Sequence, residues 1–95
     1  MIVTTGGTGI GPRDITPDVV APMLTRVIPG IMEAIRVKYG ATIPSALLSR
    51  GVAGLIGSTL VYTLPGSVKA VNEYLDELFR TLNHSLLMIM GIDSH

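Results

Sequence analysis

The clearest pattern of apolar and polar positions lies in the last third of the chain and predicts an amphipathic helix. Apolar residues recur there at steps of three and four, at Val68, Val71, Leu75, Leu78, Phe79, Leu82 and Leu86. Ser67 precedes the pattern and is expected to be its N-cap. The charged residues between the apolar positions are assigned to the opposite face; they are Lys69, Glu73, Asp76, Glu77 and Arg80.

Period-two and β-branched runs predict three strands. The runs "VAGLI" at 52–56 and "TLVYTL" at 59–64 are separated by Gly57-Ser58, which predicts a β-hairpin with glycine leading its turn. The run "MIVTT" at 1–5 predicts a buried strand that ends at Gly6-Gly7.

Proline and glycine divide the middle of the chain into further helical segments. Thr16 and Pro17 suit an N-cap and a first helical residue, and predict a helix over 17–27. A second helix is expected from Pro29 to a stop at Gly40, and the stretch 42–50 suggests a short helical turn. Together the elements predict an α/β layered fold with a mostly parallel sheet, one antiparallel hairpin and flanking helices.

Composition narrows the class of protein. A chain of 95 residues suits one domain over 1–95, and its 47% of hydrophobic residues against 15% charged residues predicts burial of apolar surface in a homo-oligomer. The formal net charge of zero gives no support to nucleic-acid binding. The absence of cysteine is compatible with a reducing cytoplasm, and the apolar stretch 52–64 is too short to span a membrane as a helix.

The stretch "TTGGTGIGPRDITPD" at 4–18 carries the strongest chemical signal. Successive glycine N–H groups after a strand can bind an anion without a lysine. Dinucleotide and Walker A signatures do not fit, because Pro12 stands where a third glycine is needed and no Gly-Lys-Ser/Thr occurs. The alternative is a connecting loop without a ligand.

A second junction of the same kind is "LPGS" at 64–67, which again follows a strand and opens a helix. The amides of Gly66 and Ser67 and the Ser67 hydroxyl could bind a second anion, although a capped turn is the alternative. Because the carboxyl ends of parallel strands meet at one edge of a sheet, both junctions are expected to border one crevice. His84 and His95 are assigned to structure or tail, since no second histidine stands at ligand spacing.

Three segments in this order, "TTGGTGIGPRDITPD", "SALLSRGVAG" and "TLVYTLPGSVKAV", resemble the landmarks of the MoaB/MogA-like molybdopterin-binding domain. The resemblance implies an α/β domain, usually trimeric, that acts in molybdenum cofactor biosynthesis. Catalytic members of the family transfer AMP from Mg-ATP to the terminal phosphate of molybdopterin. It therefore implies molybdopterin, ATP and Mg²⁺ as ligands.

The resemblance also implies roles for individual residues. Asp14 would be the catalytic and metal-binding aspartate, although it could instead cap a turn. Arg13 could clamp a phosphate, and Asp18 suits the positive end of a helix dipole. The other residues expected to bind the pterin or nucleotide are Thr5, Gly6, Gly7, Thr8, Gly9, Ser49, Arg50, Pro65, Gly66 and Ser67.

The chain departs from the family at its start. Members normally carry a further N-terminal strand and helix with a second acidic motif that helps to bind nucleotide and metal, so this chain is expected to be short there. The alternative function is accordingly a non-catalytic module that binds molybdopterin or another anion.

Overall fold

Four strands form one sheet in the computed structural model, which describes residues 1–91. The strands are β1 (Ile2–Thr5), β2 (Arg26–Val27), β3 (Ala53–Ile56) and β4 (Thr59–Leu64), and they lie in the order β1-β4-β3-β2. Three α-helices, α1 (Thr16–Val20), α2 (Pro29–Gly40) and α3 (Val68–Ile89), and two 3₁₀ turns, η1 (Ala21–Met23) and η2 (Pro44–Leu48), complete the described part.

The sheet is mixed. β1 pairs with β4 in parallel, whereas β4 with β3 and β3 with β2 are antiparallel. The α/β class, the hairpin and the flanking helices are confirmed, but one parallel pairing among three means that these strands do not make a mostly parallel sheet. The hairpin turns at Gly57, whose φ of +62° explains the glycine there.

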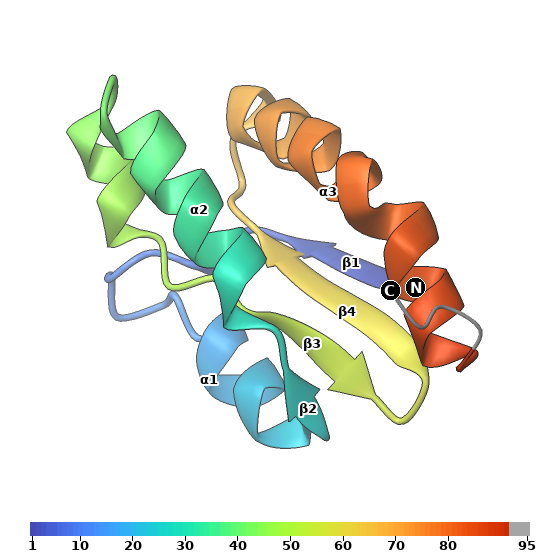
Figure 1. Cartoon of the computed structure of the whole chain (residues 1–95). Helices are drawn as coiled ribbons and strands as arrows, with labels where there is room; N and C mark the ends of the chain where they lie inside the picture. The colour runs from blue at the N-terminus through green and yellow to red at the C-terminus, as the bar shows by residue number, and fades with distance from the viewer. Residues whose placement is uncertain (92–95) are drawn as a thin grey trace.

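Two helices cover one face of the sheet. In Figure 1, α2 and α3 lie side by side above the strands, and α1 lies below them. The core between these layers takes Met32 and Ile35 from α2, Leu60 and Tyr62 from β4, and Leu78 from α3, all 3% exposed or less. Burial of these apolar side chains provides the main stabilisation of the layers.

Helix α3 forms as expected, but Val68 and Phe79 do not belong to its buried face. The hydroxyl of Ser67 accepts a hydrogen bond from Ala70 N–H at 3.1 Å, which confirms the N-cap. The face that enters the core is centred on Tyr74 and Leu78, so Val68 and Phe79 are 79% and 58% exposed. Their periodicity is helical, but they point away from the sheet.

The segment between Thr16 and Ile28 differs most from the expectation. Helix α1 ends at Val20, and the chain turns through η1 into the short strand β2, where a helix to residue 27 was predicted. The N-cap of α1 is Ile15, and the Thr16 hydroxyl instead donates to the carbonyl of Gly6 at 3.1 Å. A strand of two residues is too short to give a recognisable alternation of apolar and polar positions in the sequence.

The strand β1 lies at the edge of the described sheet. Ile2 and Val3 are 49% and 37% exposed, so the expected full burial of this strand is not found. Other large apolar side chains are also exposed, and their burial against another copy of the chain stays a prediction.

Candidate functional site

The parallel pairing of β1 with β4 brings the two predicted junctions together. Thr5 lies opposite Leu64 in the register, and Gly6 N–H donates to the Leu64 carbonyl at 2.8 Å. The chain leaves both strands at the same edge, so residues 6–9 and 65–67 border one cavity of about 480 Å³.

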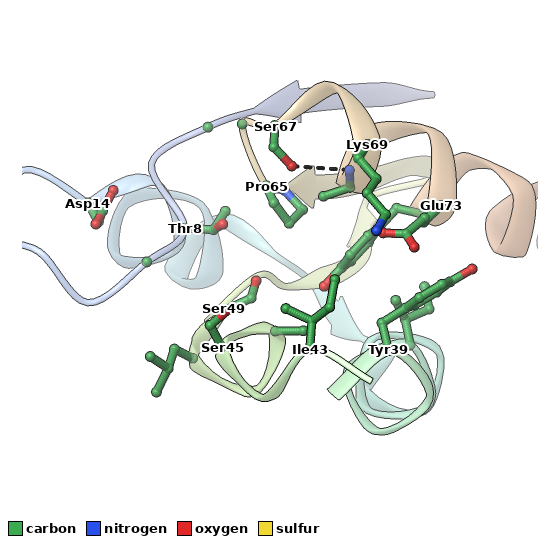
Figure 2. Close-up of a pocket in the computed structure, with 18 of the residues that line it drawn as sticks. Thr8, Asp14, Tyr39, Ile43, Ser45, Ser49, Pro65, Ser67, Lys69 and Glu73 are labelled. Atoms are coloured by element: carbon green, nitrogen blue, oxygen red, sulfur yellow. Dashed lines mark hydrogen bonds between the residues drawn. The ribbon is translucent and has the colours of Figure 1, made fainter. Parts of the chain in front are cut away.

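The cavity wall contains nine of the twelve residues expected from the sequence. They are Gly6, Gly7, Thr8, Gly9, Asp14, Ser49, Pro65, Gly66 and Ser67. Figure 2 shows Asp14 at one end of this cavity, Thr8, Ser49 and Ser67 between, and Lys69 and Glu73 toward the other end.

In the glycine loop, four consecutive carbonyls are held by two other residues. The Gly6 carbonyl accepts from the Thr16 hydroxyl and the Gly7 carbonyl from Thr16 N–H, at 3.1 Å each. The next two carbonyls, of Thr8 and Gly9, accept from the backbone N–H and the Nε of Arg50 at 2.7 and 2.8 Å.

This arrangement leaves the loop amides available. In a trans peptide the C=O and the following N–H point in opposite directions. The N–H groups of residues 7–10 therefore point away from Thr16 and Arg50, and we find no acceptor for them within residues 1–91. Such a run of unpaired amides can bind an anion.

Glycine is required at two points of this loop. Gly7 has φ +71°, and a Cβ there would collide with the Thr16 hydroxyl. At Gly9 a Cβ would stand 2.8 Å from Asp14 Oδ2. The close approach of the loop to Thr16 and Asp14 therefore depends on the missing side chains.

Asp14 both closes a turn and faces the cavity. Its Oδ2 accepts from Gly11 N–H at 2.9 Å, and its own N–H donates to the Gly11 carbonyl at 3.0 Å. The turn-capping alternative thus describes part of its role, and the carboxylate also lines the cavity wall. One carboxylate oxygen, Oδ1, has no hydrogen bond with the described residues.

The second junction offers donors from the start of α3. The first N–H groups of a helix have no partner within it, and the positive end of the helix dipole adds to their field. Because Ser67 Oγ accepts from Ala70 N–H, its own hydroxyl hydrogen stays available to a ligand.

Thr8 adds a hydroxyl to the wall between these two junctions. The residue is only 4% exposed, and within the described chain its side chain has no hydrogen bond. A threonine hydroxyl that lines a cavity and has no partner in the described protein is suited to a bound polar group.

The far end of the cavity is more apolar and was not expected from the sequence. Tyr39 and Ile43 border it on the side of α2, and Lys69, Glu73 and Tyr74 on the side of α3. Lys69 and Glu73 lie on the polar face of α3 as expected, but this face was not predicted to border the cavity. The spacing of Lys69, Ala70, Glu73 and Tyr74 along one helix face after "PGS" was the available signal.

Three expected residues lie outside the cavity wall: Thr5, Arg13 and Arg50. Thr5 belongs to β1, and Arg13 is exposed in the turn before Asp14. The Arg50 guanidinium donates four hydrogen bonds, to the carbonyls of Gly9 and Asp14 and to both carboxylate oxygens of Asp18 at 3.1 Å.

The pair of Arg50 and Asp18 stabilises the charged form of each partner. The hydrogen bonds from Arg50 hold the pKa of Asp18 below its ordinary value, and those to Asp18 raise the pKa of Arg50. Asp18 is thus an ion-pair partner in addition to standing in the first turn of α1.

The described residues include no group of three His, Cys, Asp or Glu side chains close enough to hold a metal ion. His84 lies in α3, and His95 is outside the described residues. No helix of residues 1–91 is long and apolar enough to cross a membrane.

Comparison with known proteins identifies the family of this chain. Residues 1–84 match the family described as probable molybdopterin binding domain. A molybdopterin adenylyltransferase of Helicobacter pylori is 36% identical over 91 residues, which make up 96% of this chain and 52% of that protein. A molybdenum cofactor biosynthesis bifunctional protein of Chlorobaculum tepidum is 44% identical over 95 residues, covering 99% of this chain and 30% of that protein.

Solved structures show the same fold. The Mog protein from Mycobacterium ulcerans superposes with a TM-score of 0.88 at 45% identity, covering 93% of this chain and 58% of that one. MoaB from Thermus thermophilus superposes with a TM-score of 0.84 at 44% identity, covering 95% of this chain and 57% of that one. The chain spans about half or less of the length of the curated relatives named here.

Proposed function

Because the chain belongs to the molybdopterin-binding domain family of molybdenum cofactor biosynthesis, we propose that its cavity binds molybdopterin, with the phosphate at the glycine loop. The observation that supports this most directly is the run of unpaired amides at residues 7–10 beside the helix N-terminus at Ser67. Backbone N–H groups and a helix N-terminus are a common phosphate site, and they need no basic side chain.

The other end of the cavity suits the pterin. The Tyr39 and Tyr74 side chains provide aromatic surface there, and the Glu73 carboxylate can accept hydrogen bonds from the amino edge of the ring. Lys69, which Figure 2 places beside Glu73, offers donors to the ring carbonyl. A phosphate-bearing pterin would thus extend from the amides to the aromatic end.

A finer proposal is adenylyl transfer. A phosphate oxygen of molybdopterin would attack the α-phosphorus of ATP, and the bond to pyrophosphate would break. Since the nucleophile is already anionic, the task of the protein is to position two anionic partners and to offset their charge. The loop amides and the Ser67 hydroxyl supply donors for that positioning.

Asp14 is the residue suited to hold a Mg²⁺ ion in this reaction. Mg²⁺ takes oxygen ligands and commonly uses one or two carboxylates together with phosphate oxygens and water. Asp14 Oδ1 fits one such position, while no cluster of three acidic or histidine ligands occurs in the described chain. Any Mg²⁺ bound by these residues would thus depend mainly on phosphate and water oxygens.

The test is incubation of the protein with molybdopterin and Mg-ATP under anaerobic conditions, with chromatographic detection of adenylylated product. We expect Asp14→Asn, which retains an acceptor for Gly11 N–H, to lower turnover on the order of 10²-fold while molybdopterin still binds. Asp76→Asn, an exposed change on α3, is the matched control. Binding without any product in the unaltered protein favours the non-catalytic module, and absence of binding contradicts both proposals.

A further inference from the structure

Arg50 lies beside the candidate site without lining it, and its contacts indicate a role that its charge alone does not. Its backbone N–H binds the Thr8 carbonyl, and its guanidinium binds the carbonyls of Gly9 and Asp14. These three carbonyls belong to the two ends of the loop that carries the free amides. The side chain thus holds the loop at Gly9 and Asp14, and the backbone of the same residue holds it at Thr8.

We propose that Arg50 is a positioning residue: it holds the Thr8 and Gly9 carbonyls from outside the cavity and thereby directs the following amides toward the phosphate. Asp18 in turn orients Arg50, because both of its carboxylate oxygens accept hydrogen bonds from the guanidinium. The inference rests on the proposed phosphate site.

The peptide geometry connects Arg50 to the ligand. Each carbonyl that Arg50 holds belongs to the same rigid plane as the next N–H, so rotation of the carbonyl rotates the amide with it. The amides directed in this way are those of Gly9 and Ile10, while Thr16 acts in the same manner on the two preceding peptides. Without these partners the loop could turn its carbonyl oxygens toward an anion, which would repel it.

Direct phosphate binding by Arg50 is the alternative, and its hydrogen bonds oppose it. The guanidinium already donates to three separate groups of the protein, and Asp18 offsets its charge. Four of its five N–H donors bind protein groups, so a two-point contact with a ligand would require Arg50 to release Asp18 or a loop carbonyl. A planar fork with several fixed acceptors is a geometry that lysine cannot reproduce.

The test compares Arg50→Lys, Asp18→Asn, the double variant and the control Arg26→Lys by ¹H–¹⁵N spectra and titration with molybdopterin. Arg50→Lys keeps the charge and loses the fork, so we expect Kd to rise at least about 10-fold. The amide signal of Ile10, which shares a peptide plane with the Gly9 carbonyl, should shift most among residues 7–10 even without ligand, whereas the signals of α2 should stay in place. Asp18→Asn should weaken binding a few-fold, and the double variant should add little to Arg50→Lys, since both changes act on one unit.

The outcomes separate the inference from the proposed function. If the unaltered protein does not bind molybdopterin, the proposed function fails, while the ligand-free amide signals still report on Arg50. If Arg50→Lys weakens binding but leaves the amides of residues 7–10 unmoved, Arg50 contacts the ligand directly and the inference is overturned. If Arg50→Lys does not fold, the amide signals and the Kd are compared between Asp18→Asn and the unaltered protein. The Asp18 side chain is 59% exposed, so this change removes little packing.

Discussion

The backbone at Gly66 lies against Gly6: a Cβ on Gly66 would stand 3.3 Å from the Gly6 Cα. Each glycine follows one of the two parallel strands, so the junctions at the ends of β1 and β4 are in contact. The width of the cavity at its amide end is thus determined by two residues without side chains.

Gly66→Ala should force these junctions apart by a few tenths of an ångström and weaken molybdopterin binding several-fold. Gly30→Ala is the matched control, because a Cβ there would meet no atom within 4 Å and alanine is favoured in the helix. Titration of both variants by pterin fluorescence checks the expectation. Equal affinity of Gly66→Ala and the unaltered protein would contradict this role of the junction contact.

Thr8→Val should lower molybdopterin affinity about 3- to 10-fold with a stability change below about 1 kcal/mol. The hydroxyl has no partner in the described protein, so its removal breaks no internal hydrogen bond, whereas a bound polar group loses one. Thr8→Ser retains the hydroxyl and should bind like the unaltered protein. Calorimetric titration and thermal unfolding of the three proteins provide the comparison, and a weak Thr8→Ser would point to packing instead.

Leu78→Ala should destabilise the protein by about 2–4 kcal/mol, and Phe79→Ala by less than about 1 kcal/mol. The two residues are adjacent in α3, but Leu78 is 3% exposed and Phe79 is 58% exposed. Urea denaturation of both variants measures the difference in the free energy of unfolding. Similar losses would mean that Phe79 is also buried, as the periodicity alone suggested.

The free energy of unfolding should fall at alkaline pH through Tyr62. Burial raises the pKa of this phenol above its ordinary value of 10.0, and a hydrogen bond with Ser85 partly opposes the shift. An acid whose pKa is raised by folding contributes stability that is complete below the unfolded pKa and is lost as pH rises through the folded pKa. Tyr62→Phe should lose this dependence. Denaturation at pH values from about 8 to about 12, a range that begins roughly two units below the ordinary tyrosine pKa, measures the difference. An unchanged alkaline profile in Tyr62→Phe would assign the effect to other groups.

The sequence was informative wherever a residue acts through its own backbone or nearest neighbours. The Gly57 turn, the Ser67 cap and helix α2 follow from local rules, and the structure contains all three. The glycine loop could also be identified as a candidate anion site, since strand, glycines and helix start are contiguous in the chain.

The errors concern relationships between distant residues. Ligand binding by Arg50 stays a prediction, but its contacts with Gly9, Asp14 and Asp18 could not be predicted, because they join residues 32 to 41 positions apart. Glu73 and Lys69 were correctly placed on the polar face of α3, but a helical pattern does not show that this face borders a cavity. The strand β2 has only two residues and exists through its pairing with β3.

The parallel pairing of β1 with β4 makes the cavity depend on two distant parts of the chain. Because Ile2 pairs with Val61, the walls of the cavity come from residues at opposite ends of a long closed loop, and no part of the chain can form the cavity alone. A ligand bound to both junctions would therefore stabilise this long-range contact. At a ligand concentration of about 100 times Kd, binding would add about 2.7 kcal/mol to the free energy of unfolding. The concentration of the ligand in a cell would thus also affect the fraction of this protein that is folded.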